Sequence, residues 1–195
     1  MSKIIGLTGG IGSGKTTIAN YLASLNIPVY IADNAGRKVM QYKEVLEAIQ
    51  EKFGNAIFDE NHLNRAKLAE IVFNNPEQLK ALNALVHPAV RKDFSDWLIE
   101  HEKKPFVVYE SAILFESGRY QDFDYIINIT APLETRISRV LERDKSNREQ
   151  VLNRINAQWT DEQRVSKSDF AIENIDIELA KQEIDKILKI LLIKQ

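Results

Sequence analysis

A glycine-rich segment near the N-terminus has the residue types and the spacing of a phosphate-binding loop. Residues 9–16 read GGIGSGKT and match the pattern G-x-x-x-x-G-K-[ST]. Glycines let the main chain approach a phosphate closely, and successive N–H groups form a concave anion site. Lys15 would add a positive charge for the β- and γ-phosphates, and the Thr16 hydroxyl would bind Mg²⁺. The pattern therefore predicts the binding of a nucleoside triphosphate with Mg²⁺.

The segments on either side of the loop are those that a nucleotide site requires. An apolar segment at residues 4–7 precedes it, and residues 15–25 follow with Ile18, Leu22 and Leu25 on one helical stripe. A helix that starts directly after the loop directs its positive N-terminal end toward a bound phosphate. The alternative is a glycine-rich turn between a strand and a helix, with Lys15 merely solvated. The strand before the loop and the helix after it favour the nucleotide site.

Short apolar segments alternate with segments of helical periodicity along the rest of the chain. We expect strands at residues 4–7, 28–31, 106–110, 125–129 and 170–172, and helices at 15–25, 133–143, 148–159 and 177–192. Strands separated by helices predict an α/β fold whose parallel sheet is covered on both faces. Capping pairs indicate three helix starts: Asn75 with Gln78, Ser146 with Glu149, and Thr160 with Gln163.

The stretch between the second and third expected strands is far longer than one crossover needs. It has helical character, and we interpret residues 34–104 as an inserted helical subdomain. Within it, His87 and Pro88 are expected to form a turn between helices. Insertions at a sheet edge often carry acceptor specificity. No linker or repeat interrupts the chain, so residues 3–195 are predicted to form a single domain.

Composition excludes several classes of protein. The chain has 195 residues, 44% hydrophobic and 28% charged, as in a globular domain. Its formal net charge of −2 disfavours nucleic acid as a partner, because phosphate binders are usually basic. There is no cysteine, which excludes disulfides, thiol nucleophiles and Cys-based zinc sites. The N-terminus does not read as a signal peptide and no apolar run is long enough to span a membrane, so we expect a cytoplasmic protein without a membrane partner.

A small kinase accounts best for this combination of features. A GTPase would need a guanine-reading N-K-x-D or T-K-x-D segment, and no Asn or Thr of this chain is followed by Lys. A motor-type ATPase would usually be larger. The chain instead combines a phosphate loop, an acceptor-binding insertion and an arginine-bearing segment at residues 136–160, which we interpret as a lid with its flanking helices.

The sequence resembles the dephospho-coenzyme A kinase family over nearly its whole length. The segments that carry the resemblance are residues 7–17 (LTGGIGSGKTT), Ile31-Ala32-Asp33, Leu63-Asn64-Arg65, His87-Pro88, Leu114-Phe115-Glu116, Arg139-Val140, Arg143-Asp144 and Ala157-Gln158. Two of these segments depart from the residues that are usual in the family. Ile31 stands in place of the first Asp of D-A-D, and Asn64 stands in place of the Asp of I-D-R.

This resemblance implies both a fold and a reaction. The fold is that of a P-loop NTPase, a three-layer α/β/α arrangement with a five-stranded parallel sheet, plus a helical acceptor-binding insertion and a short lid. The reaction is ATP-dependent phosphorylation of the ribose 3′-hydroxyl of dephospho-CoA, with ATP and Mg²⁺ as cofactors and CoA and ADP as products. Two alternatives stay open: another small-molecule or nucleotide P-loop kinase, and an ATP-binding regulatory module without phosphoryl transfer.

Four residues are the candidates for catalysis: Lys15, Asp33, Arg139 and Arg143. Asp33 follows the second expected strand, where a carboxylate can orient the acceptor hydroxyl or take its proton; the alternative is an N-cap for the next helix. The two arginines share a helix face with Arg136, the weakest candidate of the three. Such a face could clamp the triphosphate, or it is an ordinary solvated face.

The expected nucleotide contacts extend from the loop into the helix after it. We expect ATP to contact Gly10, Gly12, Ser13, Gly14, Lys15, Thr16 and Thr17, with Thr16 as the metal ligand. Glu110 ends the third expected strand and either reaches Mg²⁺ through water or is a surface carboxylate. Arg65 either contacts the phosphates of the acceptor or is a surface arginine.

Overall fold

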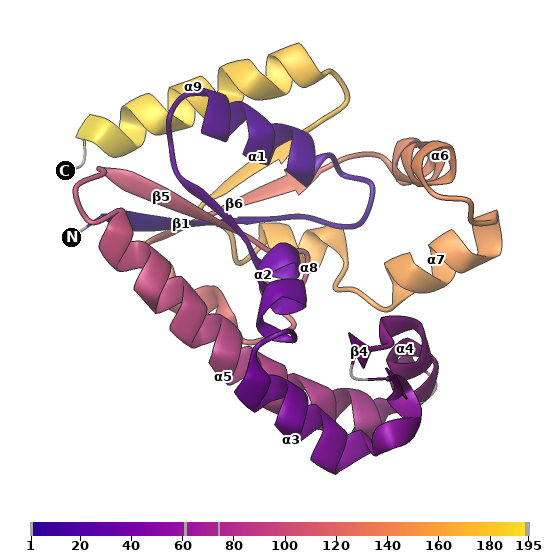
Figure 1. Cartoon of the computed structure of the whole chain (residues 1–195). Coiled ribbons are helices and arrows are strands. Elements are labelled where there is room, and N and C mark those ends of the chain that lie inside the picture. Colours follow the sequence, from indigo (N-terminus) through magenta and orange to yellow (C-terminus); the bar gives the residue numbers. More distant parts are fainter. Residues whose placement is uncertain (1, 61, 74, 194–195) are drawn as a thin grey trace. The chain divides into compact units, whose positions relative to one another are not determined.

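The chain divides into two compact units. The structure is a computed structural model that describes residues 2–60, 62–73 and 75–193 (Figure 1). Residues 1–31 and 101–195 form one unit, which we call the sheet unit, and residues 32–100 form the other, which we call the helical unit. Residues 194 and 195, the end of the predicted domain, lie outside the described residues.

Parallel strands form the main sheet of the sheet unit, as the alternating pattern predicted. They are β1 (Lys3–Thr8), β2 (Val29–Ile31), β5 (Phe106–Glu110), β6 (Tyr125–Thr130) and β7 (Phe170–Glu173), in the spatial order β2-β5-β1-β6-β7. In the central strand β1, Leu7 pairs in register with Glu110 of β5 and Ile127 of β6. The sheet grows in both directions from β1, and parallel sheets of this kind bind ligands beyond the carboxyl ends of such strands.

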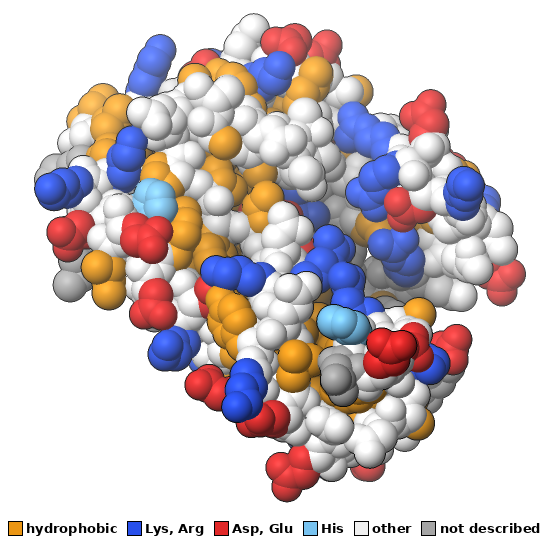
Figure 2. Space-filling model, viewed as in Figure 1, with side chains coloured by type: hydrophobic (Ala, Val, Ile, Leu, Met, Phe, Trp, Pro, Cys, Tyr) orange, Lys and Arg blue, Asp and Glu red, His pale blue; other side chains and the backbone are white. Residues whose placement is uncertain are grey.

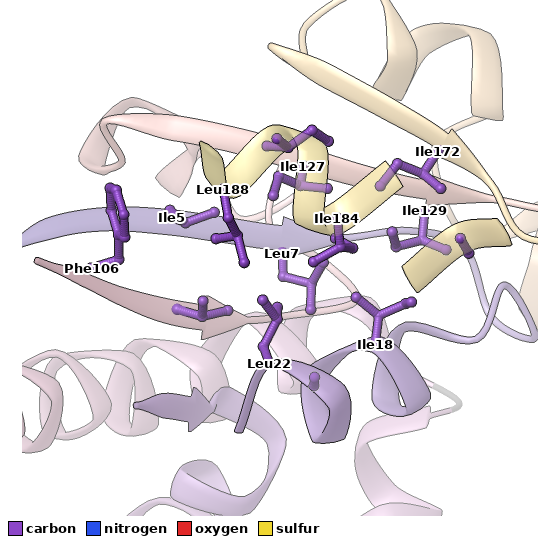
Figure 3. Close-up of a cluster of buried hydrophobic side chains, with 14 of the residues drawn as sticks. Ile5, Leu7, Ile18, Leu22, Phe106, Ile127, Ile129, Ile172, Ile184 and Leu188 are labelled. Atoms are coloured by element: carbon purple, nitrogen blue, oxygen red, sulfur yellow. The ribbon is translucent and has the colours of Figure 1, made fainter. Parts of the chain in front are cut away.

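Two helices cover one face of this sheet. Helix α1 (Lys15–Ser24) contributes Ile18 and Leu22 to the core, and helix α9 (Ile177–Ile193) contributes Ile184 and Leu188 (Figure 3). The strand residues of the same core are Ile5, Leu7, Phe106, Val108, Ile127, Ile129 and Ile172. Because these side chains are buried between the helices and the strands, both β1 and α1 are held firmly. The two ends of the glycine-rich loop between them are therefore fixed by the core.

Three shorter helices lie between β6 and β7 in the chain. They are α6 (Leu133–Arg143), α7 (Arg148–Asn156) and α8 (Asp161–Val165). The helix predicted at residues 133–143 is confirmed, whereas the helix predicted at 148–159 ends earlier, at Asn156. Helices α6 and α7 pack through Ile137, Val140 and Val151, and Ile11 of the glycine-rich loop packs against this cluster. A single 3₁₀ turn, η2 (Arg119–Asp122), precedes β6.

Side-chain caps define where α7 and α8 begin. The capping box predicted at Thr160 is present and starts α8. The box predicted at Ser146 and Glu149 is wrong, because the chain enters α7 one residue later. Asn147 has the extended backbone of an N-cap, and it exchanges hydrogen bonds with Gln150 at 2.9 and 3.1 Å. Both Ser and Asn are good N-caps, so the local sequence alone could not distinguish the two starts.

In its described residues, the helical unit contains four helices and a pair of short antiparallel strands. The helices are α2 (Ala32–Val39), α3 (Lys43–Phe53), α4 (Arg65–Phe73) and α5 (Pro76–Glu100). A 3₁₀ turn, η1 (Asn55–Ile57), leads into the antiparallel strands β3 (Phe58–Asp59) and β4 (His62–Leu63). The unit has its own core, formed by Val45, Ile49, Ile57, Leu68 and Val72.

Helix α5 begins as predicted but does not break where expected. The Asn75 side chain caps it by accepting hydrogen bonds from the backbone N–H groups of Glu77 and Gln78 at 3.0 and 3.2 Å. The turn predicted at His87-Pro88 is wrong, since Pro88 lies inside the helix. A proline removes one helical hydrogen bond, and the burial of Val86 and Val90 on either side holds the helix together. No helix in the described part of the chain is long and apolar enough to cross a membrane.

Candidate active site

The glycine-rich loop connects the carboxyl end of the central strand to the first turn of α1. Strand β1 ends at Thr8 and α1 begins at Lys15, so residues 9–14 form the loop. Gly14 is the N-cap residue, and its carbonyl accepts hydrogen bonds from the N–H groups of Thr17 and Ile18 at 3.0 and 3.2 Å. The predicted strand–loop–helix arrangement is therefore present. It places the positive end of α1 at the edge of the sheet where ligands bind.

Three glycines of the loop, Gly9, Gly12 and Gly14, occupy backbone conformations that other residues avoid. Gly12 and Gly14 have φ angles of +80° and +93°, in the left-handed region. A Cβ atom on Gly12 would collide with the backbone carbonyl of Arg136, and one on Gly14 would collide with the side-chain amide of Asn174. The loop is thus packed directly against α6 and against the residues after β7. Only glycine satisfies the backbone angle and the close approach at once.

Lys15 lies beside an acidic side chain at the edge of the sheet. Its Nζ atom is 3.8 Å from Oε1 of Glu110, and the exposed fractions of the two side chains are 11% and 7%. Glu110 is the last residue of β5 and pairs in register with Leu7 of β1, which brings it next to the loop. The carboxylate compensates a cation that would otherwise be costly to bury. The ion pair therefore holds the Lys15 ammonium group at the carboxyl ends of the central strands.

The three hydroxyl residues of the predicted site differ in their surroundings. Thr16 and Thr17 are exposed in the first turn of α1, with their hydroxyl groups available to a ligand or an ion. Ser13 is fully buried, and its Oγ atom has no hydrogen-bond partner among the described residues. The described residues contain no group of three or more His, Asp or Glu side chains that could hold a metal by itself.

Asn174 is a residue of this site that the sequence analysis did not identify. It directly follows β7 and is buried, and its side-chain amide donates a hydrogen bond of 2.8 Å to the carbonyl of Ser13. Its backbone N–H donates to the carbonyl of Thr130 at 2.8 Å. The signal that could have found it is its place at the carboxyl end of a strand, where parallel sheets carry their ligand-binding residues.

The three arginines of α6 have different partners, although their spacing puts them on one face. Arg136 is buried and donates from Nε to the carbonyl of Ile11 at 2.9 Å. Arg139 is half-buried and makes long contacts of 3.5 and 3.4 Å with the carbonyls of Ser13 and Ile175. Arg143 is exposed. Figure 2 shows that Lys and Arg side chains on the surface over α6 and α7 are interspersed with acidic ones.

Asp144 joins the end of α6 to α7 through two arginines. Arg143 donates two hydrogen bonds to its carboxylate at 2.9 and 3.2 Å, and Arg154 of α7 donates one at 2.8 Å. These hydrogen bonds lower the pKa of Asp144 well below its ordinary value, and they raise the pKa of Arg143. Arg143, a predicted phosphate ligand, is therefore engaged in an ion pair with the neighbouring Asp144 in this structure.

The Asp144→Asn substitution is expected to destabilise the protein at neutral pH but not in acid. A carboxyl group whose pKa is lower in the folded than in the unfolded protein stabilises the fold above its ordinary pKa of about 4. That contribution disappears as the pH falls from about 5 toward the lower folded-state value. Because the pairs are partly exposed, we expect a loss of at most about 1 kcal/mol at pH 7.

Melting temperatures of the wild type and of Asp144→Asn at pH 7, 5 and 3 test this linkage. The difference between them should shrink steadily over the acid range. Glu142→Gln, which removes an exposed carboxylate from the same helix, is the matched control. A difference that stays constant down to pH 3 would show that the two arginines do not act through the charge of Asp144.

Asp33 lies in the helical unit, in the first turn of α2. The helix begins at Ala32, one residue earlier, and the Asp33 side chain is exposed. The alternative role as N-cap is therefore wrong, because an N-cap precedes the first helical residue. The carboxylate still benefits from the positive end of the helix, and it follows directly on β2, whose last residue is Ile31.

The helical unit also contains a pocket lined by cationic and apolar side chains. Its volume is about 320 Å³, and its lining consists of Arg37, Met40, Gln41, Leu46, His62, Leu63 and Arg65. Arg37 lies near the end of α2, and Arg65 is the first residue of α4. The pocket therefore combines two permanent positive charges with an apolar surface, a combination suited to an anionic group carried on an organic chain.

Comparison with known proteins decides the family of this chain. The sequence model of the family described as dephospho-CoA kinase matches residues 3–178. The chain belongs to the dephospho-CoA kinase family. The dephospho-CoA kinase of Fusobacterium nucleatum is 41% identical over 172 residues, which cover 88% of this chain and 89% of that protein. That of Bacteroides fragilis is 35% identical over 175 residues, covering 89% and 85%. The protein is therefore a kinase, and the resemblance seen in the sequence motifs is confirmed.

Solved structures confirm the predicted fold. A crystal structure of a Thermus thermophilus protein matches with a TM-score of 0.87 and 36% identity, over 96% of this chain and 97% of that one. The dephospho-CoA kinase of Campylobacter jejuni matches with a TM-score of 0.65 and 27% identity, over 97% of each chain. Shikimate kinase of Acinetobacter baumannii, at 19% identity over 97% and 94% of the two chains, shares the fold with a TM-score of 0.56. The chain thus has a P-loop kinase fold.

One departure from the usual family residues has a clear structural role. Asn64 accepts hydrogen bonds from the backbone N–H groups of Ala66 and Lys67, both at 3.0 Å, and so caps α4. Its amide also donates to Asp59 at 2.6 Å. Asn and Asp are equally good N-caps. The substitution therefore preserves the start of α4, and with it the place of Arg65 as the first residue of that helix.

Proposed function

We propose that this protein transfers the γ-phosphoryl group of ATP to the ribose 3′-hydroxyl of dephospho-CoA, giving coenzyme A and ADP. Membership of the dephospho-CoA kinase family supports the acceptor and the reaction. The observation that supports the donor side is Lys15, held with Glu110 at the end of a glycine-rich loop that opens a helix. A location in the cytoplasm stays a prediction from the sequence.

The sheet unit supplies the groups that bind ATP. The N-terminus of α1 binds the phosphates together with loop N–H groups other than those of Ile11 and Ser13, which donate to Gln158 and to the Gly10 carbonyl. Lys15 neutralises charge on the transferred group. Mg²⁺ fits this site, because the exposed Thr16 hydroxyl and the Glu110 carboxylate are the hard oxygen donors that it prefers alongside water and phosphate oxygens. Bound there, Mg²⁺ would offset negative charge on the phosphates. Little covalent chemistry is required of the protein, since phosphoryl transfer depends mainly on positioning and charge.

The helical unit supplies the groups that bind the acceptor. Asp33 orients the 3′-hydroxyl and accepts its proton as the bond to phosphorus forms. The pocket that contains Arg37, His62 and Arg65 binds the diphosphate and the adjoining pantetheine chain of dephospho-CoA. Two guanidinium groups suit a diphosphate, and the apolar side chains of Met40 and Leu46 suit a pantetheine chain.

Arg65→Ala is expected to raise the KM for dephospho-CoA by about tenfold and to leave the KM for ATP unchanged. The loss of one charge-assisted hydrogen bond to a phosphate in a partly exposed pocket has about this effect. Steady-state kinetics with each substrate varied in turn measures both constants. Arg91→Ala, which removes an exposed arginine of α5 in the same unit, is the matched control and should change neither. An equal change in both constants would argue against an acceptor site in this pocket.

The proposed reaction is tested by ADP release from the purified protein with ATP and Mg²⁺, with and without dephospho-CoA. We expect ADP release to depend on the acceptor, and the product to be identified by mass as coenzyme A in equal amount. Turnover with a different hydroxyl compound would indicate another small-molecule or nucleotide kinase. ATP binding without turnover on any acceptor would indicate a regulatory module. Either result would overturn the proposed function.

A further inference from the structure

Arg136 is the arginine of α6 whose surroundings differ most from those of a phosphate ligand. Only 4% of its surface is exposed, and burial lowers its pKa from the ordinary arginine value. Its Nε donates to the carbonyl of Ile11, and its Nη1 donates to Asp161 at 2.9 Å. Its Nη2 lies where a Cβ atom on Gly10 would be, so this glycine leaves the space that the guanidinium occupies.

Asp161 and Arg164 of α8 extend this contact into a partly buried cluster of charges. The two carboxylate oxygens of Asp161 are shared between Arg136, at 2.9 Å, and Arg164, at 2.7 Å. Arg164 is fully buried, and its Nη1 lies 3.7 Å from Oε1 of Glu116. Two arginines and two carboxylates make the cluster neutral in total. Such neutrality is what allows charged groups to be buried, and removal of one member leaves an uncompensated charge.

Ile11, at the centre of the phosphate loop, is held on three sides by residues from outside the loop. Its carbonyl accepts from Arg136, and its N–H donates to Oε1 of Gln158 at 2.9 Å. Its side chain packs against the cluster of Ile137, Val140 and Val151 between α6 and α7. The backbone N–H and carbonyl groups of Ile11 are thus satisfied by distant side chains rather than by the loop itself. The loop conformation therefore depends on α6 and on residues 158–161.

We propose that Arg136 is a positioning residue, which holds the phosphate loop in its nucleotide-binding conformation through the Ile11 carbonyl and is itself held by Asp161. In this role it acts on the nucleotide through the loop. A loop that is already ordered binds a phosphate without an entropic cost of ordering, and its N–H groups are aligned in advance. The inference rests on the proposed function only in the measurements of turnover, because nucleotide binding is measured without an acceptor.

Two double variants separate this role from a direct charge on phosphate. Arg136→Gln with Asp161→Asn, and Arg136→Met with Asp161→Asn, both remove one cation and one anion, so the cluster stays neutral. Gln carries an amide nitrogen at the same distance along the side chain as Nε of arginine, and it can donate to the Ile11 carbonyl. Met has similar size and no donor. The two variants therefore differ only in the hydrogen bond to the loop.

Calorimetric titration with ADP is the first measurement, because it requires no acceptor. We expect the Met variant to bind ADP about tenfold more weakly than wild type, the effect of an unsatisfied buried carbonyl, and the Gln variant to regain most of that affinity. In steady-state kinetics the KM for ATP should rise in the Met variant more than kcat falls. Equal losses in both variants would assign the effect to the lost charge on phosphate and overturn the proposal. Unchanged ADP affinity in the Met variant, with only a lower melting temperature, would reduce Arg136 to a structural residue and also overturn it.

Hydrogen exchange in the wild-type protein tests the proposal even if either variant fails to fold. The amide of Ile11 should exchange slowly in the protein without nucleotide, because its acceptor Gln158 is in place beforehand. Addition of ADP should then protect this amide little further. Rapid exchange of Ile11 that slows only after ADP is added would show that the nucleotide, and not Arg136 with its partners, orders the loop.

Discussion

Lys15→Ala is expected to lower kcat for phosphoryl transfer by about a hundredfold or more while the protein stays folded. Lys15 provides the positive charge at the end of the loop, where negative charge moves during transfer. Circular dichroism and a thermal melt check the fold, and the coupled release of ADP measures kcat. Lys189→Ala, which removes an exposed lysine of α9, is the matched control and should keep wild-type activity.

The Lys15→Ala substitution also affects stability, through the Glu110 carboxylate. This effect can be separated from the loss of turnover. Lys15→Ala leaves this carboxylate, of which 7% is exposed, without the cation 3.8 Å away, so the melting temperature should fall. Adding Glu110→Gln removes the carboxylate that faces Lys15 and should raise the melting temperature again, whereas turnover should stay low because Lys15 and a proposed Mg²⁺ donor are then both absent. A return of activity together with stability would mean that the first loss came from misfolding. Wild-type turnover in folded Lys15→Ala would refute the assignment of the loop.

Asp33→Asn is expected to lower kcat by about 10²- to 10⁴-fold with little change in the KM for ATP. An asparagine side chain can still hydrogen-bond the acceptor hydroxyl, but it cannot accept its proton as a carboxylate does. The Asp33 side chain is exposed, so the effect on stability should not exceed the helix-dipole contribution of about 0.3–1 kcal/mol.

Glu44→Gln is the control for Asp33→Asn. Glu44 is an acidic residue in the first turn of α3 in the same unit, so the two substitutions remove a carboxylate from equivalent places in two helices. Both variants should melt within a few degrees of the wild type, and only Asp33→Asn should lose turnover. If the two variants keep the same kcat, Asp33 has no catalytic role.

Local patterns predicted the elements of this protein well because each pattern reports on a short-range interaction. The apolar segments gave the strands of the main sheet, and the Asn75 and Thr160 side chains cap the helices that they were predicted to cap. The error at Ser146 arose because two neighbouring residues were equally good caps. The continuity of α5 at Pro88 was missed because burial outweighed the local preference of proline.

The surroundings of the arginines of α6 depended on contacts that no local pattern contains. Their spacing correctly places the three arginines on one helix face, but their exposure increases along that face from Arg136, which is buried, to Arg143, which is exposed. Arg136 lies against the loop, 125 residues away in sequence from its partner Ile11, while Arg143 pairs with its neighbour Asp144 near the surface. Spacing determines which residues share a face, and only packing determines which of them meets a carbonyl, a carboxylate or water.

The sequence by itself determined the phosphate loop, the strand–loop–helix arrangement around it and the family, because all three are written in the order and spacing of nearby residues. The tertiary structure alone decided which groups surround that loop. Asn174 meets the carbonyl of Ser13 across 161 residues, and Glu110 meets Lys15 because parallel pairing sets β5 beside β1 in a particular register. Such partners depend on strand order, register and helix packing, which are settled only when the whole core forms.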